Sequence, residues 1–250
     1  MATDNNFNKW NRRDLLKVLG GIPLVGTVWF AGAKATGNAK REKQFLLETL
    51  NIKATQPPAS GPMSGKPLRI GIIGFGIRGE QLCRALGFAS NTWLKDMQEA
   101  LEKNPKDTRL ADFKAQENLN VQLAGICDVF DVRADNALTS FNRDNNKIKR
   151  YTSHTEMINS GEIDAVIIAT PDHWHAPMAI EALNAGVHVY VEKPMTHNIS
   201  ETYALRDAVA NNPKAVFAVG HQHRQTQSFL TAQDVIKKNI LGHVSLVQTN

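Results

Sequence analysis

The stretch LRIGIIGFGIRG, residues 68–79, decides the fold of this chain. Leu68–Gly74 is a short apolar run of the kind that forms a buried strand, and it leads into the spacing Gly-x-Gly-x-x-Gly. A helical pattern begins near Arg78. Between a strand and a helix, this spacing is typical of a loop that holds the pyrophosphate of a dinucleotide. The residues predicted to contact the cofactor here are Gly74, Phe75, Gly76, Ile77, Arg78 and Gly79.

Apolar strands alternate with helical patterns along the following residues. The expected strands are Val121–Asp128, Arg150–Thr152, Asp164–Thr170, Val187–Val191 and Ala215–Gly220. The expected helices are Arg78–Ala89, Val132–Phe141, a short one ending at Ser160, Trp174–Gly186 and Ser200–Ala210, with a polar, helix-patterned insertion at Asn91–Asn120. Strands that are apolar throughout and alternate with helices indicate a parallel sheet covered on both faces. We therefore predict a doubly wound α/β domain of the Rossmann type over residues 68–220.

The last residues are predicted to begin a second α/β domain. Within residues 221–250, Gln227–Asn239 has a helical pattern and Val244–Asn250 has the pattern of a new strand. A strand in this place needs a pairing partner or leaves an open edge, and an open edge favours a homo-oligomer. We expect this second domain to bind the substrate and to be mostly absent from the chain.

The first 33 residues resemble an export signal. Arg12 and Arg13 directly precede a mildly apolar run, Val18–Phe30, and small residues follow it. This order predicts a twin-arginine signal peptide over residues 1–33, recognised by the twin-arginine export machinery, and a periplasmic location. An amphipathic helix that begins with two arginines is the alternative. The apolar run is too short to predict a stable membrane span after processing, and residues 34–67 are predicted to be a linker.

Composition narrows the class of partner. The chain is 42% hydrophobic and 21% charged, as in ordinary soluble globular proteins. Its net charge of +5 includes no dense basic run and no aromatic ladder, so nucleic acid is not an expected partner. Two cysteines do not make a disulfide framework, and both are predicted to be buried thiols.

Polar residues follow the strands at their predicted carboxyl ends, which is where open parallel sheets bind ligands. Asp128 ends the second strand and can accept hydrogen bonds from the adenosine ribose. Its carboxylate would repel a 2′-phosphate, so NAD is favoured over NADP. The alternative role of Asp128 is to cap the next helix, although Asp131 stands in a better position for that.

Three further strand ends carry candidate chemistry. The fourth strand runs into TPDHWHAP (170–177), the fifth into Glu192-Lys193-Pro194, and the sixth into GHQHR (220–224). The Lys193 ammonium can hydrogen-bond a substrate hydroxyl and exchange its proton as a hydride moves to nicotinamide. His175 is expected to face the ligand crevice. The alternating histidines suggest a metal at first, but no third ligand cluster accompanies them, so no metal is predicted.

With these residues placed, the chain resembles the Gfo/Idh/MocA oxidoreductases. The matching motifs are GFGIRG, ICD, the long run ATPDHWHAPMAIEALNAGVHVYVEKPMTHN, and GHQHR. The resemblance implies that Lys193 assists proton transfer from a substrate hydroxyl. His175, from its place facing the crevice, is the second catalytic candidate. The resemblance also implies a cofactor site that includes Thr170, Pro171, His175, Glu192, Lys193, Gln222 and Arg224.

Three functions remain open at this point. The first is an exported oxidoreductase that acts on a hydroxyl of a sugar, polyol or glycoside with a tightly held NAD. The second is an NAD-dependent, redox-assisted glycosidase or lyase, as some relatives are. The third is a nucleotide-binding module without catalysis, because members of the family usually supply further catalytic residues from the second domain.

Overall fold

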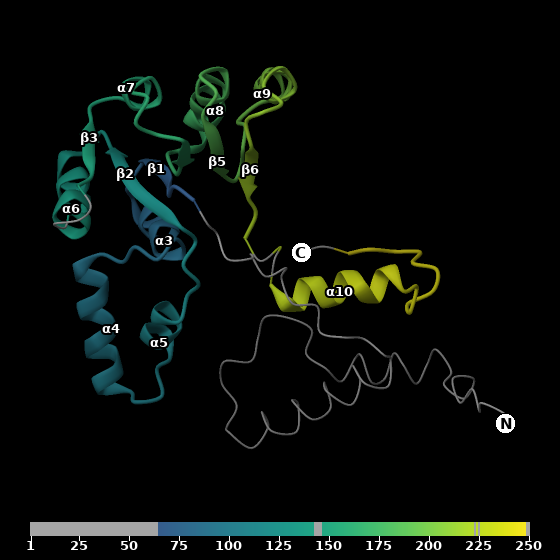
Figure 1. The fold of residues 1–250 in the computed structure, drawn as a ribbon. Coiled ribbons are helices and arrows are strands. Elements are labelled where there is room, and N and C mark those ends of the chain that lie inside the picture. The colour runs from purple at the N-terminus through teal and green to yellow at the C-terminus, as the bar shows by residue number, and fades with distance from the viewer. Residues whose placement is uncertain (1–64, 143–146, 223, 225, 249–250) are drawn as a thin grey trace. The chain divides into compact units, whose positions relative to one another are not determined.

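The computed structural model describes residues 65–142, 147–222, 224 and 226–248 (Figure 1). The chain consists of two compact units. The described residues up to Gln222 belong to the first unit, and those from Arg224 onward belong to the second. The predicted signal peptide lies outside the described residues, as does the predicted linker except for residues 65–67. Both stay predictions.

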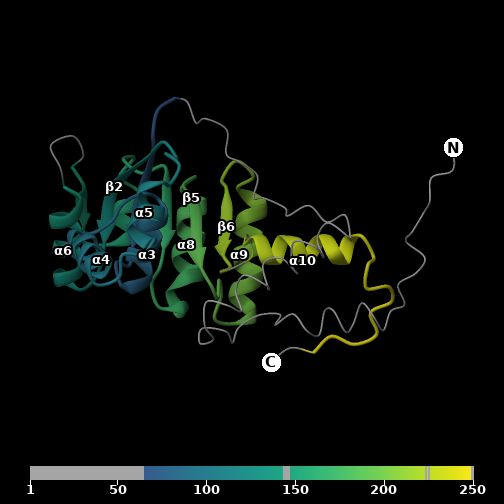
Figure 2. The same cartoon turned by 90° about the horizontal axis from the view of Figure 1, so that it is seen from below.

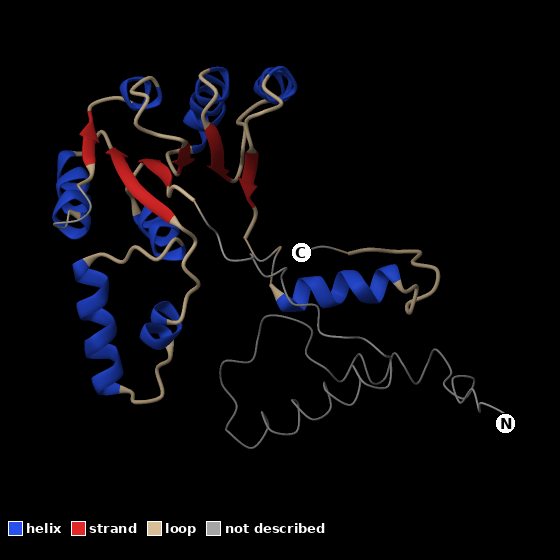
Figure 3. Cartoon of the chain, viewed as in Figure 1, coloured by secondary structure: helices blue, strands red, loops and turns tan. Residues whose placement is uncertain are grey.

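A six-stranded, fully parallel sheet forms the centre of the first unit (Figure 3). The strand order is β3-β2-β1-β4-β5-β6. The strands are β1 (Leu68–Ile73), β2 (Val121–Cys127), β3 (Lys149–Tyr151), β4 (Ala165–Ile168), β5 (His188–Glu192) and β6 (Phe217–Gly220). This order, with β1 at the centre and the chain winding outward to each edge in turn, confirms the doubly wound α/β fold.

Helices cover both faces of the sheet (Figure 1 and Figure 2). One face carries α7 (His154–Ile158), α8 (His175–Asn184) and α9 (Ile199–Asn211), and the other carries α3 (Ile77–Ala85) and α6 (Asp131–Phe141). Successive side chains of a strand point to opposite faces, so Ile72 packs with α3 and α6 while Ile73 packs with α7 and α8. Both isoleucines are almost fully buried, which is why these strands are apolar throughout.

The insertion between α3 and β2 forms two helices, α4 (Asn91–Lys103) and α5 (Arg109–Lys114). The Ser90 side chain caps α4 by accepting a hydrogen bond from the backbone N–H of Trp93 at 3.2 Å. The predicted helix Arg78–Ala89 was too long, since α3 ends at Ala85 and Gly87 follows with a φ of +91°. A left-handed residue of this kind stops a helix.

The second unit contains α10 (Gln227–Lys237), which confirms the predicted helix with an end two residues earlier. The strand predicted over Val244–Asn250 is wrong for residues 244–248, which lie in neither a helix nor a strand. A strand exists only where it pairs, and none of the described strands pairs with these residues. No helix among the described residues is long and apolar enough to cross a membrane.

Candidate functional site at the carboxyl ends of the strands

The glycine loop joins β1 to α3 with the tight backbone that its spacing predicts. Gly74 has a φ of +89°, and a Cβ added there would lie 2.8 Å from the carbonyl oxygen of Ala169. A Cβ on Gly79 would collide with the carbonyl oxygen of Gly74, so the helix can start this close to the strand only with glycine. Gly76 is the N-cap of α3 and has no side chain to cap it. The first N–H groups of α3 therefore stay available for an anion.

Asp128 stands beside this loop, directly after β2, and is 9% exposed. Its Oδ2 accepts a hydrogen bond from the backbone N–H of Phe75 at 2.6 Å, and its Oδ1 accepts one from Phe130 at 2.8 Å. The carboxylate is thus fixed between the glycine loop and the start of α6. Asp131 was expected to cap α6, and this is wrong: Phe130 is the N-cap, while Asp131 forms an ion pair with Arg150. Ile77, another predicted contact residue, is 79% exposed at the start of α3.

A pocket of about 290 Å³ opens where β4, β5 and β6 end. Its lining contains most of the side chains that the sequence predicted at these strand ends, together with two residues it did not assign, Ala169 and Asp172. The lining residues are Arg78, Ala169, Thr170, Asp172, His175, Glu192, Lys193 and Gln222. Asp172 lies inside the same motif as Thr170, so its position after β4 was the signal that could have found it.

Arg78 and Glu192 form an ion pair inside this pocket. The guanidinium Nε and Nη2 of Arg78 each lie 2.7 Å from Oε1 of Glu192. Glu192 is 5% exposed, and Arg78 also donates to Oε1 of Gln81 at 3.1 Å. From the sequence alone, two positions are possible for the Arg78 side chain: over a phosphate of the cofactor or in solvent. The structure shows a third, in which the arginine reaches from α3 to the end of β5.

Lys193 follows Glu192 and leaves its side chain exposed in the pocket. Its backbone N–H lies 3.3 Å from Oε2 of Glu192, and the peptide bond to Pro194 is cis. Among the described residues, no carboxylate forms an ion pair with its ammonium group. The amine is therefore free to meet a ligand.

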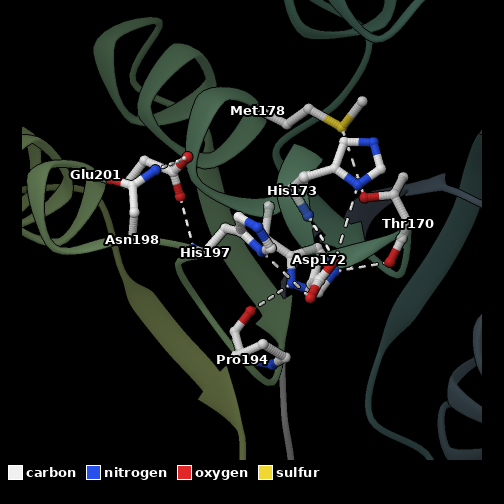
Figure 4. A network of polar contacts seen from close by, with 9 residues as sticks. Thr170, Asp172, His173, Met178, Pro194, His197, Asn198 and Glu201 are labelled. Atoms are coloured by element: carbon white, nitrogen blue, oxygen red, sulfur yellow. Dashed lines mark hydrogen bonds and ion pairs between the residues drawn. The ribbon is translucent and has the colours of Figure 1, made fainter.

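His175 lies at the start of α8, and it is 2% exposed. Its Nδ1 lies 2.6 Å from the carbonyl oxygen of Pro194, and its Nε2 lies 2.8 Å from the carbonyl oxygen of Thr170. Figure 4 shows these two backbone segments, which belong to the loops after β5 and β4. The imidazole thus joins both loops. Since both ring nitrogens contact backbone oxygens, the predicted role of His175 in acid–base chemistry stays a prediction.

Asp172 stands at the rim of the pocket between two histidines (Figure 4). Its Oδ1 accepts a hydrogen bond from the backbone N–H of His173 at 2.9 Å, and its Oδ2 lies 3.5 Å from Nδ1 of His197. Desolvation opposes ionisation here, but the His173 N–H and the charge of His197 prevail and lower the pKa of Asp172. The rim therefore carries a carboxylate in the same pocket as Lys193.

Two residues predicted to bind the cofactor, Pro171 and Arg224, do not line the pocket. Pro171 is exposed and is the N-cap of the 3-10 turn η2 (Asp172–Trp174). Arg224 belongs to the second unit, so its contact with a cofactor stays a prediction. Among the described residues, no group of three His, Cys, Asp or Glu side chains is arranged to hold a metal ion.

Comparison with known proteins places these features in a family. Residues 68–221 match the family described as "Oxidoreductase family, NAD-binding Rossmann fold" under the name GFO_IDH_MocA. This chain belongs to the Gfo/Idh/MocA oxidoreductase family. The match covers more than half of the chain and ends just past β6, so it contains both the glycine loop and Lys193.

Curated relatives match over a shorter segment. Glycosyl hydrolase family 109 protein 1 from Shewanella sp. (strain MR-4) is 37% identical over 99 residues, which are 38% of this chain and 22% of the relative. The uncharacterized oxidoreductase YdgJ from Escherichia coli is 36% identical over 94 residues, 38% of this chain and 27% of the relative. This Gfo/Idh/MocA chain therefore matches only about a quarter of their length.

Solved structures share the fold. Myo-inositol 2-dehydrogenase from Lactobacillus plantarum superposes with a TM-score of 0.54 at 25% identity, over 71% of this chain and 43% of that one. The WlbA dehydrogenase from Bordetella pertussis, in complex with NADH and UDP-GlcNAcA, gives a TM-score of 0.52 at 21% identity over 71% and 43%. At that identity the second likeness shows the fold alone.

Proposed function

We propose that this chain is the cofactor-binding part of an NAD-dependent oxidoreductase that acts on a hydroxyl group of a sugar, polyol or glycoside. One observation carries the proposal: the Lys193 side chain, which has no ion-pair partner among the described residues, lies in a pocket at the carboxyl ends of β4, β5 and β6. The hydroxyl of Thr170, the carboxylate of Asp172 and the amide of Gln222 share that pocket. Such a set offers both donors and acceptors to a ligand with several hydroxyl groups.

The residues of the first unit fit a dinucleotide. The uncapped start of α3 offers N–H donors to a pyrophosphate, and the fixed carboxylate of Asp128 offers acceptors to ribose hydroxyls. A carboxylate in this place disfavours a 2′-phosphate, which supports NAD over NADP. When bound, the nicotinamide ring supplies the hydride acceptor.

Lys193 then performs the proton transfer. As the free amine, its Nζ takes the proton of the substrate hydroxyl while the carbon that bears this hydroxyl loses hydride and becomes a carbonyl. In the reverse direction the ammonium returns the proton to the oxygen. The hydride would carry both electrons from the substrate to the nicotinamide, so no other oxidant is needed.

The cofactor is the first test. We would purify the full-length protein without added nucleotide, denature it and identify the released compounds by mass. NAD(H) in near-equal amount would support both the proposed site and a tightly held cofactor. NADP(H) would contradict the role of Asp128, and a protein that neither releases nor binds a nucleotide would contradict the proposal.

Lys193 is the second test. We would screen myo-inositol, glucose and p-nitrophenyl N-acetyl-α-galactosaminide with the NAD-loaded protein, following absorbance at 340 nm and product release. With any compound that reacts, Lys193→Ala should abolish turnover and leave the Kd of NAD within threefold. Lys214, an exposed lysine outside the pocket, supplies the matched control Lys214→Ala, which should keep full turnover. Unchanged turnover in Lys193→Ala would contradict the proposed role.

A redox-assisted glycosidase is the second candidate. It is supported by the names of two relatives, the family 109 glycosyl hydrolase and an alpha-N-acetylgalactosaminidase from Shewanella oneidensis that is 35% identical over 99 residues. Here the oxidation would be transient, and NAD would be regenerated within each cycle. Released monosaccharide without net NADH would favour this candidate over a simple dehydrogenase.

We also propose that the protein is exported to the periplasm by the twin-arginine route. Arg12 and Arg13 support the proposal, since they precede an apolar run in the order that such signals have. This route carries folded proteins, so a cofactor bound in the cytoplasm can travel inside the fold. Replacing both arginines with lysine should leave the protein in the cytoplasmic fraction, and continued export would contradict the proposal.

A further inference from the structure

We propose that Arg78 is a positioning residue that sets the charge around Lys193 through Glu192, and that it is not a ligand of the cofactor's pyrophosphate. This inference rests on the proposed function, in which Lys193 transfers the proton. It assigns a role to the arginine of the glycine loop, which stands where a phosphate contact would be expected from the sequence alone.

The geometry directs Arg78 toward β5. Two of its nitrogens lie 2.7 Å from the same carboxylate oxygen of Glu192, and its side chain is only 33% exposed. Glu192 is 5% exposed, and Arg78 supplies its counter-charge. A buried carboxylate without a counter-charge is strongly unfavourable. The guanidinium is therefore committed to Glu192 and is not available as a free cation for a phosphate.

The neighbouring strand leaves room for this pair. Gly220 of β6 is the register partner of Glu192, and a Cβ on it would lie 2.8 Å from Oε1 of Glu192. The same Cβ would collide with the hydroxyl of Tyr190, which lies 3.5 Å from that oxygen. Glycine at this position thus leaves room for the carboxylate and the phenol, which lie two residues apart along β5.

The pair balances charge next to the reactive amine. Lys193 follows Glu192 in sequence, and the charged or titratable side chains that line the pocket with it are Arg78, Asp172, His175 and Glu192. With Arg78 and Glu192 paired, their opposite charges largely cancel at the amine. Removing either partner leaves one full charge in the pocket, of opposite sign in the two cases.

The test measures Lys193 directly, in the cofactor-free full-length protein. The rate at which acetic anhydride acetylates Lys193 would be followed against pH by mass spectrometry of its peptide. The variants are Arg78→Met, Glu192→Gln and the double variant, with Arg78→Lys as the conservative replacement. Thermal unfolding would verify that each variant is folded, and Glu192→Gln alone still tests the proposal if Arg78→Met does not fold.

Opposite shifts are expected. In Arg78→Met the uncompensated carboxylate favours the ammonium, so the labelling midpoint moves up by about half a pH unit, the size expected for a unit charge across a water-filled pocket. In Glu192→Gln the uncompensated guanidinium moves it down by a similar amount. The double variant should return to the wild-type midpoint, and Arg78→Lys should lie close to it.

Cofactor affinity separates this role from phosphate binding. The double variant removes the guanidinium together with its counter-charge, so its Kd for NAD should stay within threefold of the wild-type value. A larger loss, or midpoints that do not move in opposite directions and cancel, would overturn the inference. If Lys193→Ala keeps full turnover while these shifts occur, only the proposed function fails. If Lys193→Ala loses turnover and the midpoints do not move, only this inference fails.

Discussion

Replacing His175 with alanine should destabilise the first unit by about 3 kcal/mol. The imidazole is 2% exposed and contacts the carbonyl oxygens of Pro194 and Thr170 at 2.6 and 2.8 Å. Both partners are acceptors, so a ring with one N–H donates to only one of them; losing that hydrogen bond costs about 1 kcal/mol, and a carbonyl left without a partner adds to the cost. The space left by the ring adds about 1–2 kcal/mol.

Urea unfolding followed by far-UV circular dichroism measures this loss. His173→Ala is the matched control, because its side chain is 58% exposed two residues away, and it should change the unfolding free energy by less than about 0.5 kcal/mol. A loss below about 1 kcal/mol in His175→Ala would refute the view that this ring holds the two loops together. It would favour the predicted catalytic role instead.

Three further predictions follow from other parts of the first unit. Gly79→Ala should abolish NAD binding, measured by calorimetry, because its Cβ would collide with the backbone of the glycine loop. Gly76→Ala is the control: its Cβ would lie 3.2 Å from the movable guanidinium of Arg133, so it should weaken NAD binding far less. The hydrogen bond from Arg69 lowers the pKa of Asp164, so this carboxylate adds stability above its unfolded pKa of about 3.9, and that stability is lost as the pH falls through the lower folded value. Acid unfolding between pH 6 and pH 2 should therefore be less steep in Asp164→Asn, and an equally steep curve would contradict the linkage. Burial raises the pKa of the Cys83 thiol to about 12 and that of the Cys127 thiol to about 11. At pH 8 a disulfide reagent should therefore label both cysteines only after unfolding. Labelling of the native protein would contradict their burial.

Much of the fold could be predicted from the sequence because its signals are local. Strands such as Ala165–Ile168 are buried on both faces, and a strand buried in this way consists of apolar residues throughout. The strand predicted from Val244 is wrong for residues 244–248 because a local signal is not enough to form a strand. Its apolar residues, including Leu246 at 81% exposure, have the strand pattern, but pairing depends on a partner that a local pattern does not supply.

The sequence predicts which residues form the candidate site, but it does not predict the contacts between them. Lys193 and Thr170 could be placed in one crevice because parallel strands end at the same edge of a sheet. The partner of Arg78 could not be predicted, since Glu192 lies 114 residues away and either solvent or a phosphate would satisfy the same side chain. The burial of His175 was equally hidden, because a histidine at a helix start has no sequence mark that tells a ligand contact from a backbone contact.

The order of the strands explains why the arginine has to reach so far. β1 and β5 are not neighbours, because β4 lies between them, so a side chain at the start of α3 meets the end of β5 only by crossing the end of β4. Ala169 occupies that crossing, and its Cβ would lie 3.8 Å from a Cβ on Gly79. A larger residue there would compete for space with both α3 and the guanidinium. The small residues Gly79 and Ala169 thus leave room for the Arg78–Glu192 ion pair. This pair joins the half of the sheet that carries the glycine loop to the half that carries Lys193.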